Sequence, residues 1–563
     1  MKTVKLSFKS LSGLLIVPAI LLILNGCSSH AETTGDQVKD STSPGPSSQV
    51  GLVIATPPPV SDDALLTSSN KGVFYEIFVR SFYDSDGDGV GDLKGITKKL
   101  DYLNDGDAKT TSDLGVTGIW LMPIFKSTSY HGYDISDYYE VNPQYGTKAD
   151  LVELVNQAHK RGIKIILDVA FNHTSYKHPW FVDALMNDKS TYHNWYVWAE
   201  DHGYSPGSRS PFGGPAFYGR DKKHYMAIFS NNMPDLNFDE PEVRKEIINV
   251  GQYWLKLGID GFRLDAAKHL YENFPTDRID PKTTANNQKF WQEFRAGLNA
   301  VKPDAFVVGE IWDSPIIVAP QLNQALTSGF NFELAKQLLS SASSERASAL
   351  QSTIGNVFKL YRQQSQGEAV DSVFLTNHDI DRTASQMFGD LNHARMAASL
   401  LLTIPGTPFI YYGEEIGMQG RKPDEYIREP FLWYKDGSDG EGKTHWEPSR
   451  DNSDQPVSVE AETADPNSLL SHYRNLIHLR MSEPALQSGQ LFDYSIENTN
   501  VMGYIRKTEN DQILVIHNLT AKPQEIPLND QDFNTIVAQT GTISKMKDNI
   551  VTIEPYNTVF LKK

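Results

Sequence analysis

Short apolar runs alternate along this chain with longer segments whose apolar residues recur at helical spacing. Eight such runs lie between residues 74 and 412: 74–79, 116–123, 163–169, 261–265, 305–310, 329–334, 372–375 and 408–412. Amphipathic stretches at 148–161, 241–257, 288–301 and 392–404 separate several of them. This alternation is typical of parallel strands joined by crossover helices, and therefore of the α/β class. Eight units favour a closed (β/α)8 TIM barrel; a doubly wound open sheet is the alternative, but no glycine-rich phosphate loop follows the first run.

The alternation is interrupted in two places. Between the third and fourth runs, residues 171–235 are rich in His, Trp, Tyr, Gly and Pro and show no clear period. This segment predicts a small domain inserted after strand 3. From residue 488 onward the pattern changes to short alternating runs, which predict a C-terminal β-sandwich. We therefore expect the barrel in residues 70–170 and 236–487, the inserted domain in 171–235, and the sandwich in 488–563.

The first 26 residues have the order of an export signal. Three lysines precede an apolar run at 14–24, which is too short for a comfortable membrane span. Leu24-Asn25-Gly26-Cys27 resembles the lipobox of bacterial lipoproteins, which implies cleavage before Cys27 and its modification with lipid. An ordinary signal peptide with an incidental cysteine is the alternative. Residues 27–69, rich in Ser, Thr, Pro and Gly, predict a flexible linker.

These features imply an extracytoplasmic protein, anchored by lipid to the outer face of a bacterial membrane or released from it. Cys27 is the only cysteine, so no intrachain disulfide can form. The formal net charge of -18 argues against a nucleic-acid partner, because binding to phosphates needs clustered Lys and Arg. We expect a monomer that meets the membrane only through its anchor.

Four acidic residues stand at the ends of strand-like runs. Asp168 ends the third run, Asp265 the fourth and Glu310 the fifth, while Asp379 follows the seventh. The loops after the strands of a TIM barrel build its active site, so acids at these ends indicate function. A structural ion pair or a helix cap is the commoner explanation for any one acid alone. Four acids at the same end of the barrel favour a shared site.

Arg263 stands two residues before Asp265, and side chains at i and i+2 of a strand point to the same face. The spacing predicts a guanidinium beside the carboxylate, which favours the ionised form of Asp265. Retaining glycoside hydrolysis uses an ionised carboxylate opposite a protonated one, with carboxyl groups about 5–5.5 Å apart. We expect Asp265 to be the nucleophile and Glu310 the proton donor.

Four segments resemble, in order, the four short sequence regions of the alpha-amylase family: Asp168-Val-Ala-Phe-Asn-His173, Gly261-Phe-Arg-Leu-Asp-Ala-Ala-Lys-His269, Gly309-Glu-Ile-Trp312 and Phe374-Leu-Thr-Asn-His-Asp379. The resemblance extends from about residue 71 to the C-terminus. It implies a barrel with a domain inserted after strand 3 and a β-sandwich at the end. It also implies retaining cleavage of α-glucosidic bonds through a covalent glycosyl intermediate, with starch and maltodextrins as substrates.

The resemblance implies roles around a single sugar ring. Asp265 is expected to be the nucleophile, Glu310 the general acid/base, and Asp379 the carboxylate that holds hydroxyls of the distorted sugar. The residues expected to bind the same ring or to orient the nucleophile are His173, His378, Arg263 and Tyr133.

Acidic residues at alternate positions predict a calcium site in the loop after the first run. The expected ligands around the turn at Gly89 are Asp84, Asp86, Asp88, Val90 and Asp92. The spacing resembles the first part of an EF-hand loop but has Gly95 where the twelfth-position Glu would stand, and several bacterial alpha-amylases carry such a loop. A solvated acidic turn without metal is the alternative.

A second calcium site is implied by the resemblance alone. Asn172, Asp235 and the carbonyl of His269 match positions that bridge the barrel and the inserted domain in alpha-amylases. Some relatives that act on short oligosaccharides lack this site.

Several positions bear on which polymer is cleaved. Met233-Pro-Asp-Leu-Asn237 resembles a region of members intermediate between oligo-1,6-glucosidases and neopullulanases. Lys268 and His269 match a pair that contacts leaving-side glucose in alpha-amylases, and Tyr130 replaces the Asp that closes the pocket of exo-acting relatives. These features favour endo-hydrolysis of α-1,4 bonds. A neopullulanase-like or transglycosylating enzyme is the alternative within the family, and a non-catalytic starch-binding lipoprotein is the alternative outside enzymes.

Two further residues are expected to line the sugar side of the cleft. Asp424 and Arg428 are spaced like a sugar-binding Asp and Arg of the family. A surface ion pair is the alternative.

Overall fold

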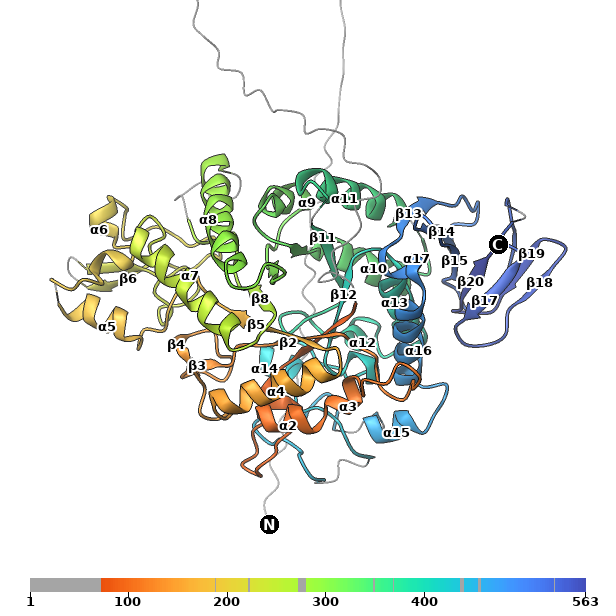
Figure 1. The fold of residues 1–563 in the computed structure, drawn as a ribbon, viewed down its shortest axis with the longest axis horizontal. Coiled ribbons are helices and arrows are strands. Elements are labelled where there is room, and N and C mark those ends of the chain that lie inside the picture. Colours follow the sequence, from red (N-terminus) through yellow and green to blue (C-terminus); the bar gives the residue numbers. More distant parts are fainter. Residues whose placement is uncertain are drawn as a thin grey trace, which may run out of the picture. The chain divides into compact units, whose positions relative to one another are not determined.

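The computed structural model describes residues 72–187, 189–220, 223–271, 280–347, 350–367, 369–435, 440–453, 457–530 and 532–563. Their central element is a closed barrel of parallel strands in the order β1-β12-β11-β10-β9-β8-β5-β2 (Figure 1). The strands are β1 (Phe74–Ile77), β2 (Gly118–Leu121), β5 (Lys164–Val169), β8 (Gly261–Leu264), β9 (Phe306–Gly309), β10 (Ser328–Phe330), β11 (Val370–Phe374) and β12 (Thr407–Tyr411). Each overlaps one of the eight apolar runs, so the predicted TIM barrel is confirmed.

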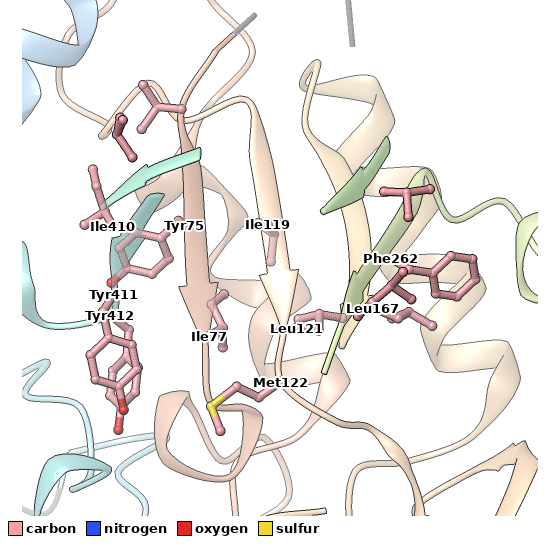
Figure 2. Packing of buried hydrophobic residues seen from close by; sticks show 14 of the residues in the cluster. Tyr75, Ile77, Ile119, Leu121, Met122, Leu167, Phe262, Ile410, Tyr411 and Tyr412 are labelled. Carbon is pink, nitrogen blue, oxygen red and sulfur yellow. The ribbon is translucent and has the colours of Figure 1, made fainter. Parts of the chain in front are cut away.

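The strands bury both of their faces, which explains why they read as continuous apolar runs rather than alternating ones. One set of side chains fills the inside of the barrel, where the Phe74 ring stacks on Phe306 and Phe409 at centroid distances of 5.1 and 4.9 Å. The alternate set packs outward beneath the helices; Figure 2 shows Tyr75 and Ile119 of this outer cluster. Asp168 and Glu310, two positions beyond Ile166 and Val308 of the inner set, therefore face the barrel mouth.

Most helices that cover the barrel follow the predicted amphipathic stretches. They include α4 (Lys148–Lys160), α7 (Pro241–Lys256), α8 (Pro281–Asn299) and α13 (Leu391–Thr403). Helix α8 begins seven residues before the predicted stretch, because Asp280 caps it and Pro281 occupies its first turn. Its first turns are polar and carry no apolar period. The apolar pattern therefore predicts a helix that begins later than the observed one.

The remaining helices are short or lie outside the predicted stretches. They are α1 (Val79–Phe82), α2 (Leu93–Lys98), α3 (Leu100–Leu103), α5 (Pro179–Met186), α6 (Ala199–His202), α9 (Pro315–Val318), α10 (Phe332–Ser344), α11 (Leu350–Gln364), α12 (Thr383–Gln386), α14 (Asp424–Ile427), α15 (Val459–Thr463), α16 (Leu469–Ser482), α17 (Pro484–Ser488) and the 3₁₀ helices η2 (His193–Trp195), η4 (Ala319–Leu322) and η5 (Glu414–Ile416).

Two excursions from the barrel bring side chains to its mouth. The hairpin of β3 (Phe125–Ser127) and β4 (Ile135–Val141) follows β2. The chain between β5 and β8 holds α5, η2, α6 and the hairpin of β6 (Phe217–Arg220) and β7 (Lys223–Met226). This second excursion has its own small apolar cluster, which includes Phe217 and Ile228.

The C-terminal part consists of two antiparallel sheets. The larger has the order β13-β14-β15-β20-β17 and the smaller the order β16-β19-β18. Their bounds are β13 (Gln490–Asp493), β14 (Val501–Lys507), β15 (Gln512–Asn518), β16 (Gln524–Pro527), β17 (Thr535–Gln539), β18 (Lys545–Lys547), β19 (Ile550–Ile553) and β20 (Thr558–Lys562). One apolar cluster joins Leu514 and Val559 of the larger sheet to Ile526 and Val551 of the smaller. The predicted β-sandwich is confirmed.

The predicted signal peptide (residues 1–26), linker (27–69) and lipidation site at Cys27 lie outside the described residues. Within the described ranges, no helix combines the length and the apolar character that a membrane crossing requires.

A buried arginine joins the sandwich to the barrel. Arg506 of β14 is 0% exposed, and its guanidinium donates to the carbonyls of Thr403, Leu486 and Gly489. Thr403 is the last residue of α13, so the contact crosses between the two parts. Since no carboxylate contacts Arg506 among the described residues, carbonyl oxygens alone solvate its charge.

Arg506→Ala should lower the free energy of unfolding by about 3 kcal/mol, because buried carbonyls that lose their donor cost about 1–3 kcal/mol each. Thermal and urea unfolding followed by circular dichroism would measure the change. Lys507→Ala is the matched control, since Lys507 is the next residue of β14 and its side chain is exposed. Equal stability of the two variants would contradict this role of Arg506.

Candidate active site

The guanidinium of Arg263 lies at the centre of the barrel mouth. Its Nη1 donates to Asp168 Oδ1 at 2.9 Å and to Asp265 Oδ1 at 2.7 Å, while Nη2 lies 3.1 Å from Glu310 Oε2. The contact with Glu310 is an ion pair without hydrogen-bond alignment. Arg263 and Asp168 are both 0% exposed. The structure therefore brings three of the four predicted acids onto one buried cation.

The backbone after β8 adds a further contact to Glu310. The Ala266 N–H donates to Glu310 Oε2 at 3.0 Å. Ala266 has φ 48, in the left-handed region that costs a non-glycine residue of order 1–3 kcal/mol. The strained residue directly follows Asp265, so the turn fixes both carboxylates relative to each other.

The fourth predicted acid, Asp379, lies between two cations. Arg428 Nη2 donates to Asp379 Oδ1 at 2.9 Å and to Asp424 Oδ2 at 3.1 Å, and His378 Nε2 lies 3.0 Å from Asp379 Oδ2. Arg428 is buried, at 2% exposure. Asp424 and Arg428 therefore do more than form a surface ion pair, because Arg428 also contacts Asp379.

Tyr133 connects the two groups of acids. Its hydroxyl donates to Asp168 Oδ2 at 2.9 Å and lies 2.6 Å from His378 Nε2. The loop that carries Tyr133 is fixed by Asp134, whose carboxylate accepts hydrogen bonds from the hydroxyls of Ser127, Thr128 and Ser129. The ring of Tyr133 is thereby held at the cavity.

Burial raises the pKa of both central carboxyls. The pKa of Glu310 is raised to about 7 by burial, against the lowering effect of Arg263 and with a further increase from Asp265. Burial likewise raises the pKa of Asp265 to about 6, although Arg263 opposes it. The guanidinium of Arg263 lies beside Asp265 and lowers its pKa, as the spacing predicts, but desolvation outweighs this effect. Glu310 still keeps its proton to higher pH than Asp265.

The pKa of Asp379 is lowered, whereas the pKa values of Asp265 and Glu310 are raised. Burial alone would raise the pKa of Asp379, but His378 and Arg428 hold it well below its ordinary value. The pKa of His378 is raised to about 10, because Asp379 and Glu76 outweigh the effect of burial. His378 Nδ1 donates to Glu76 Oε1 at 2.5 Å. At neutral pH His378 is therefore an imidazolium, held between Glu76 and Asp379.

A cavity of about 590 Å³ opens onto these groups. Its lining includes Asp265, Glu310 and Asp379 together with the predicted residues Tyr133, His173, His269, Asp424 and Arg428. Arg263 lies beneath the carboxyls and does not line it. His173 is uncharged at neutral pH, because burial lowers its pKa to about 4. The structure thus gathers the predicted substrate residues around one cavity, apart from Arg263, Lys268 and His378.

Lys268 and Tyr130 lie beside the cavity. Lys268 Nζ contacts Asp313 Oδ2 at 2.9 Å and donates to the carbonyl of Trp312 at 3.4 Å. The Tyr130 ring stacks on Trp446 at a centroid distance of 5.3 Å, and the Arg428 guanidinium lies 5.8 Å from it. Both residues therefore support neighbours of the cavity.

Sequence reasoning missed several residues of this site. The apolar side of the cavity is formed by Phe212, Phe229 and Trp312, which are 57%, 38% and 45% exposed. The two phenylalanines come from the irregular segment between β5 and β8, where no period marks them. Glu76 lies inside the first run, so the test for acids at the ends of runs passed over it. A search for any acid within an apolar run would have found Glu76.

The acidic loop after β1 brings three predicted metal ligands together. One oxygen from each of Asp84, Asp86 and Asp88 lies within 4.8 Å of the others. Such an all-oxygen set fits a hard cation. The carboxylate of Asp92 instead caps α2, accepting from Gly95 N at 2.8 Å, and also accepts from Ser85.

The position of Gly95 explains why the loop departs from an EF-hand. A Cβ there would lie 2.0 Å from the carbonyl oxygen of Tyr83, so no glutamate can occupy the twelfth position. The backbone of Val90 stays in the loop, where its N–H donates to Asp88 Oδ1 at 2.8 Å. The loop supplies fewer side-chain ligands than a full EF-hand.

The second set of predicted metal ligands is also close in space. Asn172 Nδ2 donates to the carbonyl of His269, and the N–H of Leu236 donates to the carbonyl of Asn172. Asp235 is buried; its Oδ2 accepts from Ile228 N at 3.2 Å, and its Oδ1 has no partner among the described residues. Burial raises the pKa of Asp235 well above its ordinary value. An unpartnered buried carboxylate oxygen also fits a hard cation.

Comparison with known proteins identifies the family. The model of the alpha-amylase catalytic domain matches residues 76–489, and that of the alpha-amylase SusG C-terminal domain matches residues 501–560. Alpha-amylase 3 of Dictyoglomus thermophilum is 39% identical over 497 residues, covering 87% of this chain and 93% of the relative. Oligo-1,6-glucosidase of Parageobacillus thermoglucosidasius is 30% identical, covering 82% and 92%. The crystal structure of an alpha-amylase from H. orenii has a TM-score of 0.82 and 44% identity, covering 88% of this chain and 99% of that one. The chain belongs to the alpha-amylase family of glycoside hydrolases.

Proposed function

We propose that this enzyme is a retaining endo-hydrolase of α-1,4-glucosidic bonds in starch and maltodextrins. The observation that carries the proposal is the placement of Asp265 and Glu310 on one buried guanidinium at the same cavity. An ionised carboxylate and a protonated one at the same cavity are the two groups that retaining hydrolysis requires.

In the proposed mechanism, Asp265 attacks the anomeric carbon while Glu310 protonates the departing glycosidic oxygen. A covalent glycosyl intermediate forms on Asp265. Glu310, now ionised, then takes a proton from water, which attacks the anomeric carbon and frees Asp265. Asp379 accepts hydrogen bonds from ring hydroxyls, and Tyr133 supplies a face for the ring.

The endo preference is supported by Tyr130, which lies beside the cavity. The chain has Tyr130 where exo-acting relatives have an Asp, and Tyr130 is stacked on Trp446 beside Arg428. No carboxylate at this position blocks the path of a longer glucan. Transfer of the glycosyl group to a sugar in place of water is the second candidate. Phe212, Phe229 and Trp312 favour it, because an apolar leaving side retains a sugar acceptor better than water.

Calcium is proposed at the Asp84–Asp88 loop and at Asn172, Asp235 and the carbonyl of His269. The support is the cluster of carboxylate oxygens at the first place and the unpartnered buried Oδ1 of Asp235 at the second. Bound there, the ion supplies charge that holds loops in place, and no step of the reaction depends on it. Anchoring through lipid at Cys27, a monomeric state and an extracytoplasmic location are proposed from the sequence.

Substitution of Asp265 and substitution of Glu310 should give azide products of opposite anomeric configuration. Asp265→Ala is expected to lower kcat/KM on soluble starch by at least about 10⁴-fold, and Glu310→Ala by about 10²–10⁴-fold. With an activated aryl α-maltoside, added azide should rescue both variants. Glu310→Ala should yield the α-glycosyl azide, because azide attacks the intermediate, and Asp265→Ala the β-azide, because azide replaces the nucleophile.

The control for this experiment is Asp313→Asn, since Asp313 pairs with Lys268 rather than with Arg263. It should keep kcat within about tenfold of the parent, because the pair is partly exposed and contributes little. Full starch activity in Asp265→Ala would refute the mechanism, and equal azide products from both variants would refute the assignment of roles.

The pH dependence of kcat/KM should be a narrow bell. The rate should fall below about pH 6 as Asp265 takes up a proton and above about pH 7 as Glu310 loses one. Because the two groups interact, the limbs report the pair rather than single residues. Initial rates on a soluble maltooligosaccharide over pH 4–9 test this expectation. A plateau that extends unchanged to pH 9 would contradict the proton-donor role of Glu310.

Removal of calcium should lower the melting temperature, since an ion bound only to the folded state stabilises it by about 2.7 kcal/mol at one hundred times its Kd. The double variant of Asp86→Asn and Asp88→Asn should lose most of the chelator-dependent shift. Asp107→Asn is the control, because Asp107 also makes a local turn contact in an exposed loop. A melting curve unaffected by chelator, with no calcium found by elemental analysis, would reject both sites.

A further inference from the structure

One side of the active-site cavity is built from charged side chains. Arg428 Nη2 lies 2.9 Å from Asp379 Oδ1 and 3.1 Å from Asp424 Oδ2, and the ammonium of Lys422 contacts Asp424. All four residues line the cavity. The sugar ring that is attacked belongs on this charged side in the proposed mechanism, because Asp379 accepts hydrogen bonds from its hydroxyls.

The other side of the cavity is aromatic. Phe212 and Phe229 line it with their ring centroids 4.7 Å apart, and both rings contact the imidazole of His269 at centroid distances of 5.3 and 5.9 Å. Trp312 also lines the cavity, and its ring stacks on the buried ring of Phe332 at a centroid distance of 4.5 Å. Exposed rings gathered at one place mark a surface that binds an apolar group.

The proposed proton donor adjoins this aromatic side. Glu310 precedes Trp312 by two residues, and it accepts a hydrogen bond from the N–H of Ala266, which precedes His269 by three. The departing oxygen lies beside the proton donor, and the attacked ring lies beside Asp379 on the charged side. The leaving group, and any acceptor that takes its place, therefore occupies the aromatic side.

The aromatic side offers few side chains that can bind hydroxyls. Among the described lining residues, those next to the phenylalanines that carry polar groups are Ser230, His269 and His173. The two ring nitrogens of His173 already lie 3.1 Å from Asn172 Oδ1 and 3.2 Å from the carbonyl of Tyr133. A glucose unit bound here keeps most of its hydroxyls in water, whereas an aromatic group buries apolar surface against the exposed rings.

We propose that the enzyme also transfers its glycosyl group to alcohols that carry an aromatic ring. The ring of the acceptor packs against Phe212 and Phe229. The carboxylate of Glu310 takes the proton of the acceptor hydroxyl as the acceptor oxygen bonds to the anomeric carbon, and the bond from that carbon to Asp265 breaks. The products are an α-glycoside of the alcohol, a free Asp265 carboxylate and a protonated Glu310, ready for the next cycle.

This activity rests on the proposed function, because the alcohol competes with water for the same glycosyl intermediate. A bound aromatic ring holds the acceptor hydroxyl near the anomeric carbon, and such positioning raises the rate of attack. Water has no apolar group that the aromatic side can bind. The rings therefore favour the aromatic alcohol over both water and a small aliphatic alcohol.

The test measures how one intermediate is divided between two acceptors. α-Maltosyl fluoride forms the intermediate, and benzyl alcohol and ethanol are supplied together at equal concentration, since both are primary alcohols and only one carries a ring. We expect at least about tenfold more benzyl than ethyl α-maltoside, the selectivity that an apolar pocket gives for a group of this size. The double variant of Phe212→Ser and Phe229→Ser should bring the two yields to within about threefold of each other. Because both products come from one intermediate, their ratio does not depend on how much of the enzyme is folded.

Phe492→Ser is the matched control, because Phe492 is an exposed phenylalanine of β13 that does not line the cavity. It should keep the product ratio and the rate of fluoride release within about twofold of the parent, as surface substitutions do. Equal yields of the two maltosides from the parent, or a ratio that the double variant leaves unchanged, would overturn the proposal while leaving the proposed hydrolysis intact. Absence of both fluoride release and starch hydrolysis by the parent would instead refute the proposed function.

Discussion

The buried guanidinium of Arg263 is the interaction on which the rest of the site depends. A buried cation needs acceptors or opposite charges in place of water, and carboxylates gathered at a barrel mouth repel one another without a cation. Arg263 meets both conditions with Asp168, Asp265 and Glu310 at 2.9, 2.7 and 3.1 Å. Because the guanidinium is planar and rigid, one strand side chain fixes the positions of both groups that we propose act on the substrate.

A second cation, the imidazolium of His378, makes the protonation states of the acids differ. Asp379 raises the pKa of both Glu310 and Asp265 through its charge, and it can do so only while ionised. The imidazolium of His378 keeps it ionised, and Glu76 keeps His378 charged from the far side of the ring. The acid that holds the proton is thus the one farthest from a dedicated counter-ion. The proposed roles of Glu310 and Asp265 therefore depend on the positions of Arg263 and His378.

Much of this could be predicted from sequence, since alternation along a strand is geometric. The rule that i and i+2 share a face placed Arg263 beside Asp265, and the strand ends placed Glu310 at the same mouth. The sign of the shift at Asp265 could not be predicted, because it depends on how much water the folded barrel excludes. The aromatic side of the cavity, formed by Phe212 and Phe229, could not be predicted for another reason. Tertiary contacts position the side chains of this irregular segment, and they produce no periodic pattern in the sequence.

The acidic loop and the sugar side of the cavity share one segment, residues 440–446. The N–H of His445 donates to the carbonyl of Gly89 in the loop at 2.7 Å, and the next residue, Trp446, stacks on Tyr130. Tyr130 in turn lies beside the guanidinium of Arg428, which holds Asp379. None of these contacts touches Asp265 or Glu310, the two carboxyls that we propose act on the substrate. A change in the shape of the loop therefore reaches the site through its sugar-binding wall, and acts on how the glucan is held before it acts on how the bond is cleaved.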